Sequence, residues 1–245
     1  MSKTWALVPL KNLDRAKQRL VPALSEDQRR NLVLAMARDV LAALEKSASI
    51  TKTLLVSSEP EAGRLLRDRN VDVFYSHRDE GINRELESAA AYAHSRGADR
   101  ALIVHGDLPF LNTATIDRFI EHAPSGTVRA ARCKTGKGTN LLFAPLPLEI
   151  KLKFGRNSFR QFVKEAEDHN LQLETVVDER LGMDIDSPED FVMLMAKRDD
   201  AILLGGATRA FLGNYAGISS PVQKLTHCES RPAHNKPPIT DDFVI

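Results

Sequence analysis

The sequence of 245 residues contains few cysteines and no excess of charge of either sign. Cys133 and Cys228 lie far apart without a Cys-x-x-Cys spacing, which argues against a structural zinc site or a disulfide framework and fits a reducing compartment. A formal net charge of +1 creates no field that would attract nucleic acid or an anionic membrane. No apolar run approaches the roughly 20 residues that span a bilayer, and no signal peptide precedes the strand-like run at Trp5. We therefore expect a cytoplasmic protein with neither nucleic acid nor a membrane as partner.

Histidine also lacks a pattern typical of a catalytic or metal site. Four histidines share no common spacing, and Cys133 has no histidine near it in the sequence. The four are His77, His94, His105 and His122. This argues against a catalytic triad and against a zinc site.

The chain does contain a regular alternation of short β-branched or Leu-rich runs with longer segments of helical period. This pattern predicts an α/β protein with βαβ units and a mostly parallel sheet flanked by helices. The clearest helix is expected at residues 25–46, because Ser25 and Gln28 have the spacing of a capping box. Further helices are expected at 61–69, 83–95, 113–122 and 158–168, and one that begins at Ser187. Strands are expected at 5–8, 53–57, 71–75, 101–105, 127–133, 140–143 and 173–177.

The pattern fades after about residue 204. The last part of the chain is rich in Ser, Pro, His and Lys, and it has little of the apolar content that a core needs. We therefore expect one folded domain over residues 1–204 and a largely flexible C-terminal extension over residues 205–245.

Three aspartates form the most informative pattern. Asp184 and Asp186 flank Ile185, and on an extended backbone both carboxylates face one side while Ile185 faces the core. Asp107 follows an apolar run and Gly106, which places it at the carboxyl end of a buried strand, where ligands of open α/β sheets bind. Two separate sources of carboxylate oxygens suit Mg²⁺ and leave positions for phosphates. An isolated Asp-x-Asp is more often a solvated turn, so Asp107 is what favours the metal site.

Two further loops have both a structural and a functional interpretation. Residues 134–139 form a hairpin turn with two glycines or, alternatively, a loop whose amides contact an anionic substrate. Residues 154–158 lead into a helix, whose N-terminus can bind a phosphate or carboxylate, although Asn157 or Ser158 can equally be a simple N-cap. A Walker A loop is excluded, because Ala131 and Gly138 occupy the required glycine and hydroxyl positions.

A cluster of basic residues follows the first predicted strand. Such a run is usually a solvated face, but its position after a strand makes a triphosphate-binding role about as favoured. The residues are Lys11, Arg15, Lys17 and Arg19.

In order along the chain, these motifs closely resemble the 2-phospho-L-lactate guanylyltransferase family of deazaflavin coenzyme biosynthesis, over roughly residues 4–200. That family includes phosphoenolpyruvate and 3-phospho-D-glycerate guanylyltransferases. The motifs are Val8-Pro9-Leu10-Lys11, Ala16-Lys17-Gln18-Arg19-Leu20, Asn83, Gly106-Asp107-Leu108-Pro109, Gly138-Thr139-Asn140, Phe154-Gly155 with Ser158, and the segment 184–190.

The resemblance implies a nucleotidyltransferase fold related to nucleotide-diphospho-sugar transferases, and a set of residue roles. Asp107, Asp184 and Asp186 would hold Mg²⁺ and, with Lys17, carry catalysis. Thr139, Gly155 and Ser158 would bind the phosphorylated three-carbon acid. Lys11, Lys17, Arg19 and Asn83 would bind the nucleotide.

The implied reaction joins GMP from GTP to 2-phospho-L-lactate, phosphoenolpyruvate or 3-phospho-D-glycerate and releases pyrophosphate. A homodimer and direct transfer of an unstable product to the next enzyme are further expectations. The alternatives are a molybdopterin or sugar-phosphate nucleotidyltransferase, an Asp-x-Asp glycosyltransferase, and a catalytically inactive binding protein. The first of these usually has a glycine-rich loop after the first strand, and residues 8–20 contain no glycine.

Overall fold

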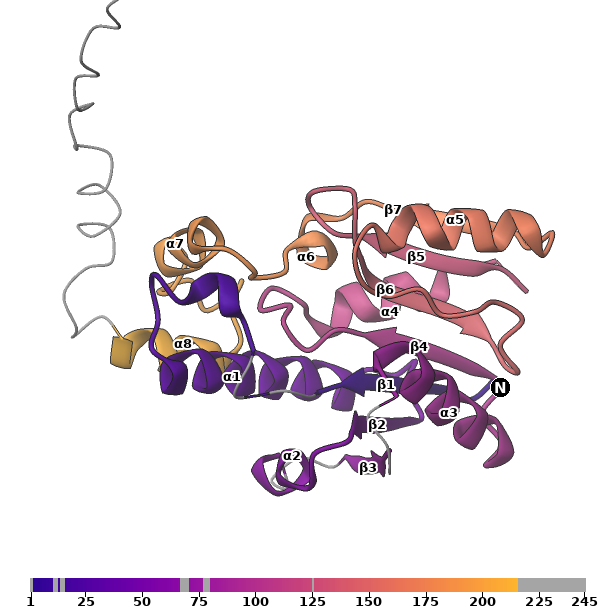
Figure 1. Ribbon diagram of the computed structural model, residues 1–245, viewed down its shortest axis with the longest axis horizontal. Coiled ribbons are helices and arrows are strands. Elements are labelled where there is room, and N and C mark those ends of the chain that lie inside the picture. The colour runs from indigo at the N-terminus through magenta and orange to yellow at the C-terminus, as the bar shows by residue number, and fades with distance from the viewer. Residues whose placement is uncertain are drawn as a thin grey trace, which may run out of the picture.

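The computed structural model describes residues 2–10, 13, 16–66, 71–76, 80–124 and 126–215. The described chain forms a sheet of seven strands in the order β3-β2-β1-β4-β6-β5-β7, flanked by helices (Figure 1). The strands are β1 (Thr4–Pro9), β2 (Lys52–Ser57), β3 (Asp72–Tyr75), β4 (Arg100–Val104), β5 (Val128–Arg132), β6 (Thr139–Pro145) and β7 (Leu173–Val176). The prediction of an α/β protein with a mostly parallel sheet is confirmed.

One strand runs against the others. The pairs β1·β2, β1·β4, β2·β3 and β5·β7 are parallel, whereas β6 is antiparallel to both β4 and β5. The first residues of β6 therefore lie at the same edge of the sheet as the last residues of β1 and β4. The strand order reverses between β1 and β4: β2 and β3 follow on one side of β1, and β4 lies on the other. Open α/β sheets bind their ligands at such a reversal of strand order.

Helices cover both faces of the sheet. They are α1 (Glu26–Glu45), α2 (Pro60–Leu65), α3 (Ile82–Ser95), α4 (Thr113–Glu121), α5 (Ser158–Asp168), α6 (Glu179–Gly182), α7 (Pro188–Ala196) and α8 (Gly206–Tyr215), with the 3-10 turn η2 (Gln18–Leu20). Alternate residues of each strand face opposite sides. In β1, Ala6 and Val8 pack in one core with α1 and α4, whereas Trp5 and Leu7 pack in another with α3 and α5.

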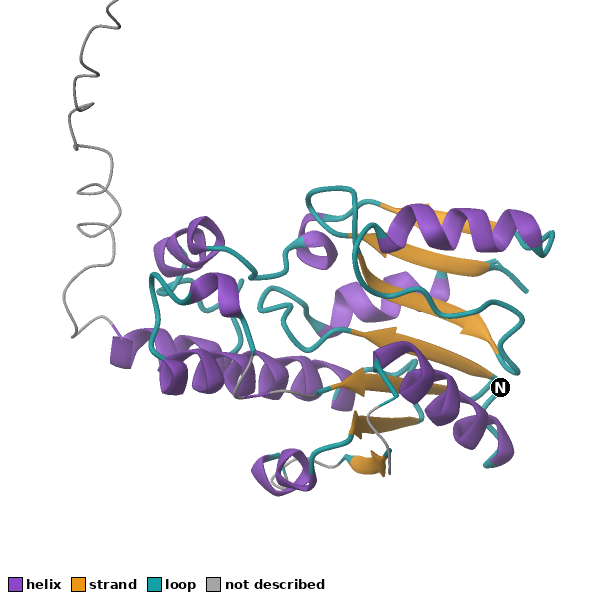
Figure 2. Cartoon of the chain, viewed as in Figure 1, coloured by secondary structure: helices purple, strands orange, loops and turns teal. Residues whose placement is uncertain are grey.

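A third apolar core lies beyond the carboxyl edge of the sheet. It joins η2, the N-terminal half of α1, α7 and α8, which we call the helical lobe. Its fully buried side chains include Leu32 and Met36 of α1, Ile185, Phe191 and Leu212. Figure 1 shows α1 running from the lobe back toward the sheet, and Figure 2 shows loops between the lobe and the strand ends.

The predicted helix starts have the expected caps. Ser25 and Gln28 form the predicted capping box at the start of α1, and Ser187 and Asp190 form a second one at the start of α7, with Pro188 in its first turn. These reciprocal bonds satisfy amides that a helix otherwise leaves unpaired. Both helices therefore begin where the sequence predicts.

The C-terminal part of the described chain differs from the sequence expectation. Helix α8 follows residue 204 directly and packs on α1, and its Leu212 and Tyr215 belong to the lobe core. Asp39, buried in α1, accepts hydrogen bonds from Ala207 N (3.0 Å) and Thr208 N (2.7 Å) at the start of α8. The folded unit therefore extends at least to Tyr215, and residues 216–245 lie outside the described part. Among the described helices, none is long and apolar enough to cross a membrane.

Candidate functional site

Lys17 lies at the centre of a charged cluster at the carboxyl edge of the sheet. Its Nζ donates hydrogen bonds to Asp107 Oδ2 and, at 2.6 Å, to Asp186 Oδ1. The backbone of Lys17 is left-handed, with φ 51°, immediately before η2, and its side chain is only 9% exposed. The loops after β1, after β4 and before α7 thus meet at one ammonium group.

The ion pairs change the pKa values of the residues that form them. Burial alone would lower the pKa of Lys17, but Asp107 and Asp186 raise it above its ordinary value of 10.5. Burial alone would raise the pKa of Asp107, but Lys17 and then His105 hold it below its ordinary value of 3.8. Both groups are therefore charged at neutral pH.

Asp184 lies beside this pair in a different environment. Burial first, and then the charges of Asp107 and Asp186, raise the pKa of Asp184 above 3.8. Its Oδ1 accepts a hydrogen bond from Asn140 Nδ2 at 3.3 Å. Ile185, between the two aspartates, is fully buried in the lobe core, as the alternation predicts.

The three aspartates offer oxygens that fit a hard cation. Asp107 Oδ1 is buried and makes no hydrogen bond, and a cation would offset the repulsion that raises the pKa of Asp184. Lys17 already neutralises part of this charge. Within the described residues, no three His, Cys, Asp or Glu side chains are arranged to hold a metal ion. The oxygen atoms of the three aspartates are the type of ligand that a hard cation prefers. Their present arrangement does not surround a cation, and the ion pairs of Lys17 with Asp107 and Asp186 would have to rearrange before one could bind.

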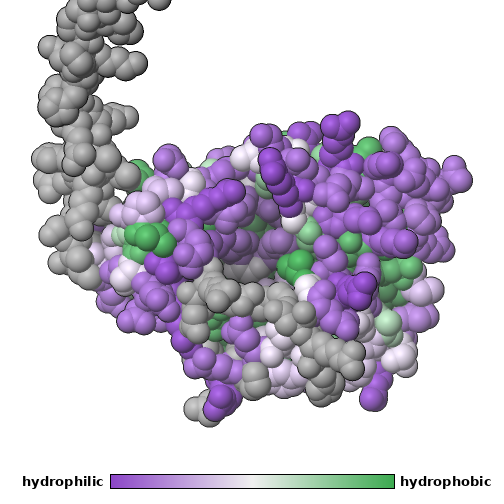
Figure 3. Space-filling view, in the orientation of Figure 1, coloured by the Kyte–Doolittle hydropathy of each residue, from purple (hydrophilic) through white to green (hydrophobic). Residues whose placement is uncertain are grey.

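A cavity of about 430 Å³ opens beside this cluster. It is lined by the ends of β1 and β4, the segment before η2, and single residues of α1, α3 and the aspartate loop. Figure 3 shows it as a hollow near the middle of the molecule. The lining includes Lys17, Arg19, Ile82, His105, Asp107 and Asp186.

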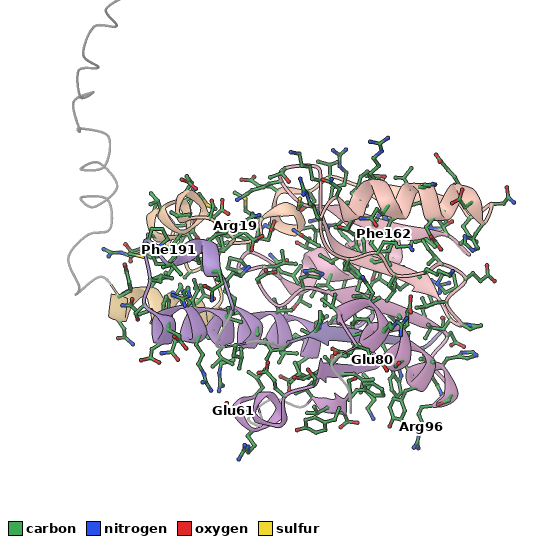
Figure 4. All side chains as sticks on the ribbon, viewed as in Figure 1. Arg19, Glu61, Glu80, Arg96, Phe162 and Phe191 are labelled. Carbon is green, nitrogen blue, oxygen red and sulfur yellow. The ribbon has the colours of Figure 1, made fainter. Side chains whose placement is uncertain are left out.

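The predicted nucleotide-binding residues have different positions. Arg19 is exposed on η2 and lines the cavity, between the lobe and the sheet in Figure 4. Lys11 lies outside the described residues. Asn83 uses both ends of its amide on the backbone of Phe154: its Nδ2 donates to the carbonyl at 3.0 Å, and its Oδ1 accepts from the amide at 2.7 Å. Asn83 therefore fixes the segment before Gly155 to α3, and its contact with a nucleotide stays a prediction.

The three residues predicted to bind the acid lie together. Thr139 N donates to Ser158 Oγ at 2.9 Å, and Ser158 N donates to the carbonyl of Gly155 at 3.2 Å. Gly155 has φ 129°, which residues with a side chain rarely adopt. Thr139 Oγ1 is buried without a hydrogen-bond partner. Asn157 occupies the N-cap position of α5 without a side-chain cap bond, so the simple capping interpretation does not describe it.

Residues 134–139 form the predicted hairpin turn, in which Gly136 has φ 71°. The turn is anchored on both sides. Lys134 Nζ forms an ion pair with Asp190 of α7, and the carbonyl of Lys137 accepts from Phe159 N at 3.1 Å. The turn therefore connects α7 with α5, and it carries Thr139 at its end.

Sequence reasoning missed two residues of the site. Asn140 is buried and joins the loop after β7 to Asp184, because its Nδ2 donates to the carbonyl of Leu181 at 3.0 Å as well as to Asp184. His105 lines the cavity directly after β4, with its ring on that of Phe154. Both were visible as polar residues at strand ends next to predicted site residues.

With this geometry in place, comparison with protein families gives a direct result. The family model described as "Guanylyl transferase CofC like" matches residues 4–209. The chain belongs to this family. It is a nucleotidyltransferase enzyme of the guanylyl type, and the family implies deazaflavin coenzyme biosynthesis.

Relatives of this guanylyl transferase carry two names. A phosphoenolpyruvate guanylyltransferase of Thermobaculum terrenum is 35% identical, over 80% of this chain and 84% of the relative. A 2-phospho-L-lactate guanylyltransferase of Methanothermobacter thermautotrophicus is 28% identical, over 77% of this chain and 82% of the relative.

Solved structures confirm the nucleotidyltransferase fold. A protein of Desulfovibrio desulfuricans G20, described as a nucleotide-diphospho-sugar transferase, superposes with a TM-score of 0.71 at 14% identity, over 91% of this chain and 99% of the other. A nucleotidyl transferase of Methanothermobacter superposes with a TM-score of 0.58 at 20% identity, over 78% and 95%. At these identities the likeness concerns the fold alone.

Proposed function

We propose that this guanylyl transferase joins GMP from GTP to the phosphate of a phosphorylated three-carbon acid and that the reaction uses Mg²⁺. The observation that carries the proposal is the meeting of two residue groups at one edge of the sheet. Lys17, Asp107 and Asp186 form the charged centre beside the cavity, and Thr139 and Ser158 form the neighbouring polar group.

The reaction needs charge neutralisation more than proton transfer. An oxygen of the acid's phosphate attacks the α-phosphorus of GTP, a P–O bond forms, and the bond to the β-phosphate breaks with its electron pair on pyrophosphate. A phosphate is already ionised near neutral pH, so no side chain has to act as a base. When bound, Mg²⁺ would neutralise phosphate charge and orient the reacting oxygens.

The side chains of this chain have separate tasks in the proposal. Asp107, Asp184 and Asp186 would hold the cation. Lys17 would contribute a positive charge to the phosphates once the aspartates bind the cation, with Arg19 at the rim of the cavity. Thr139, Gly155 and Ser158 would hold the acid, with Thr139 Oγ1 available as a donor.

Among the candidate acids we favour phosphoenolpyruvate. Relatives of that name are 30–35% identical to this chain, whereas relatives named for 2-phospho-L-lactate are 25–30% identical. The acids differ only by small groups, and pocket shape decides among such groups.

The test is incubation of the protein with GTP and Mg²⁺ and, separately, phosphoenolpyruvate, 2-phospho-L-lactate or 3-phospho-D-glycerate. We expect acid-dependent release of pyrophosphate and a product mass equal to the acid plus GMP, highest with phosphoenolpyruvate. Coupling to the next enzyme of the pathway protects against decay of an unstable product. No release with any of the three acids would refute the proposal.

The Asp107→Asn variant tests the metal assignment in the same assay. It removes a charge from the centre at constant size, so we expect turnover to fall at least about 100-fold while far-UV circular dichroism is unchanged. Asp178→Asn is the matched control, because Asp178 caps α6 outside the charged cluster. Near-normal turnover of Asp107→Asn would exclude the proposed role.

A further inference from the structure

His105 occupies the boundary between the charged centre and the acid-binding group. It follows β4, two residues before Asp107, and its backbone N donates to the carbonyl of Asn140 at 3.1 Å, one residue after Thr139. Its ring lies 5.1 Å, centre to centre, from the ring of Phe154, which precedes Gly155. His105 is thus flanked by neighbours of three predicted site residues.

The imidazole of His105 has an unused hydrogen-bonding atom. Its Nε2 is buried and has no hydrogen-bond partner in the described part of the chain, although His105 as a whole is only part-buried and lines the cavity. A buried polar atom without a partner is unfavourable, and such atoms are rare in folded proteins unless a ligand or water satisfies them.

This atom belongs to a group of three. Asp107 Oδ1 and Thr139 Oγ1 are also buried without hydrogen-bond partners among the described residues. His105 and Asp107 follow the end of β4, and Thr139 begins β6, which pairs with β4. Asp107 is accounted for by the proposed cation and Thr139 by the proposed acid. His105 Nε2 has no role in the proposed reaction as described so far.

We propose that His105 is a substrate-binding residue that donates a hydrogen bond from Nε2 to an anionic oxygen of the three-carbon acid. The proposal rests on the proposed guanylyl transfer and adds one contact to it. His105 lines the cavity in which the acid would bind, and Phe154, held by Asn83, packs against the imidazole ring. An imidazole N–H suits carboxylate and phosphate oxygens equally.

A packing role alone does not account for the unpaired nitrogen of His105. If His105 only filled space beside Phe154, an apolar ring would serve as well and leave no polar atom unsatisfied. A variant with an aromatic ring but no ring nitrogen keeps the packing, whereas a variant with a side-chain amide keeps the hydrogen bond. Comparing the two therefore separates a packing role from a hydrogen-bonding role.

The experiment compares His105→Phe, which keeps a ring against Phe154, with His105→Gln, whose amide reaches approximately the position of Nε2. We expect His105→Phe to raise the KM for the acid about 10- to 100-fold, as for a lost hydrogen bond to a charged group, with the KM for GTP within about twofold of wild type. His105→Gln should recover most of the affinity. His122→Gln, on an exposed histidine at the end of α4, is the control and should change neither KM.

Thermal unfolding of each variant serves as the check that it is folded. The KM values of the folded variants and the activity of the wild type then decide the proposal. An unchanged KM for the acid in His105→Phe would overturn the proposal, as would an equal rise of both KM values. If His105→Phe does not fold, the comparison of His105→Gln with His105→Leu replaces it. If wild-type protein releases no pyrophosphate with any acid, the proposed function fails and this contact fails with it, whereas an active wild type with an indifferent His105→Phe refutes the contact alone.

Discussion

The charge balance of the site depends on Lys17. Its ammonium group contacts Asp107 and Asp186. Asp184 has no ion pair with a described residue, and burial and the charges of Asp107 and Asp186 raise its pKa. Since the pKa of Asp107 is lowered, its ion pair adds stability above pH 3.8, and this stability is lost as the pH falls through the lowered value. Asp184 has the opposite effect, because its ionised form is disfavoured in the folded state.

This difference gives a prediction for Asp184→Asn. The stability associated with Asp184 is present below pH 3.8 and is lost as the pH rises through the raised pKa. Without metal at pH 7, Asn removes the unfavourable charge, so we expect a midpoint of thermal unfolding higher by roughly 2–4 °C, the effect of about 1 kcal/mol. At pH 3.5 the difference should be small. Calorimetry at both pH values checks this.

The same variant should lose guanylyl transfer. A gain of stability at pH 7 with loss of turnover would show that the repulsion at Asp184 serves the site rather than the fold. A lower midpoint at pH 7 would contradict the prediction. Asp178→Asn again serves as the control for an aspartate outside the cluster.

The residues of the site could be predicted only in part. The sequence predicts Asp107, Asp184 and Asp186 as metal ligands because each follows or interrupts an apolar pattern, and that role stays a prediction. The contacts of Lys17 could not be predicted from the sequence, since its partners lie 90 and 169 residues away and no local pattern encodes such pairs. The role of Asn83 was likewise hidden, because its amide bonds to a backbone 71 residues away.

At the scale of elements, Asp39 of α1 caps the start of helix α8, and this contact leaves no room for a side chain at residue 205. A Cβ atom on Gly205 would lie 2.1 Å from Asp39 Cγ, so Asp39 can cap α8 only if residue 205 has no side chain. Tyr215 at the other end donates its hydroxyl to the carbonyl of Ala23 at 3.0 Å. Helix α8 therefore connects α1 with the segment that follows η2.

Gly205→Ala should consequently lower the free energy of unfolding, whereas the neighbouring Gly206→Ala should leave it unchanged or raise it. Gly205→Ala forces Asp39 away from the amides of α8, which we expect to cost about 1–3 kcal/mol, as in overpacked cores. At Gly206 nothing lies within 4 Å of an added Cβ, so Ala should be neutral or stabilise the helix by up to about 1 kcal/mol. Urea denaturation of both variants measures the difference, and equal stabilities would contradict it.

Most elements were predictable, and the missed ones have clear reasons. Helix α1 has an apolar face and a complete capping box, so both its type and its start follow from the sequence. Helix α8 begins with glycines and gains its stability from Asp39, which is distant in sequence. Helix α6 is four residues long, too short for a periodic pattern, although its Asp178 cap is recognisable afterwards.

At the scale of the whole molecule, the described chain has three apolar cores. The core of the helical lobe includes residues as far along the chain as Tyr215. The family model reaches residue 209, inside α8. The sequence predicted the sheet and its flanking helices but placed the end of the folded unit at 204, because local composition does not reveal which distant surface a short helix covers.

Two truncations test this boundary. A chain that ends at Tyr215 should unfold at the wild-type temperature within about 2 °C, since it retains every core residue of the described chain. A chain that ends at Leu204 loses Leu212 and Tyr215, and deletions of large buried side chains cost about 2–5 kcal/mol each. Differential scanning calorimetry distinguishes the two, and a fully stable shorter chain would show that the lobe does not need α8.

The antiparallel direction of β6 has a consequence for how such enzymes can diverge. Lys17 and Asp107 follow the parallel strands β1 and β4, whereas Thr139 begins β6, whose hairpin partner β5 lies on the side of β6 that faces away from β4. The proposed nucleotide and acid groups thus lie on the two sides of the β4·β6 ladder. The hairpin turn is anchored to α7 and α5 rather than to β1 and β4, so under the proposed function we expect the acid to differ among related enzymes more readily than the nucleotide.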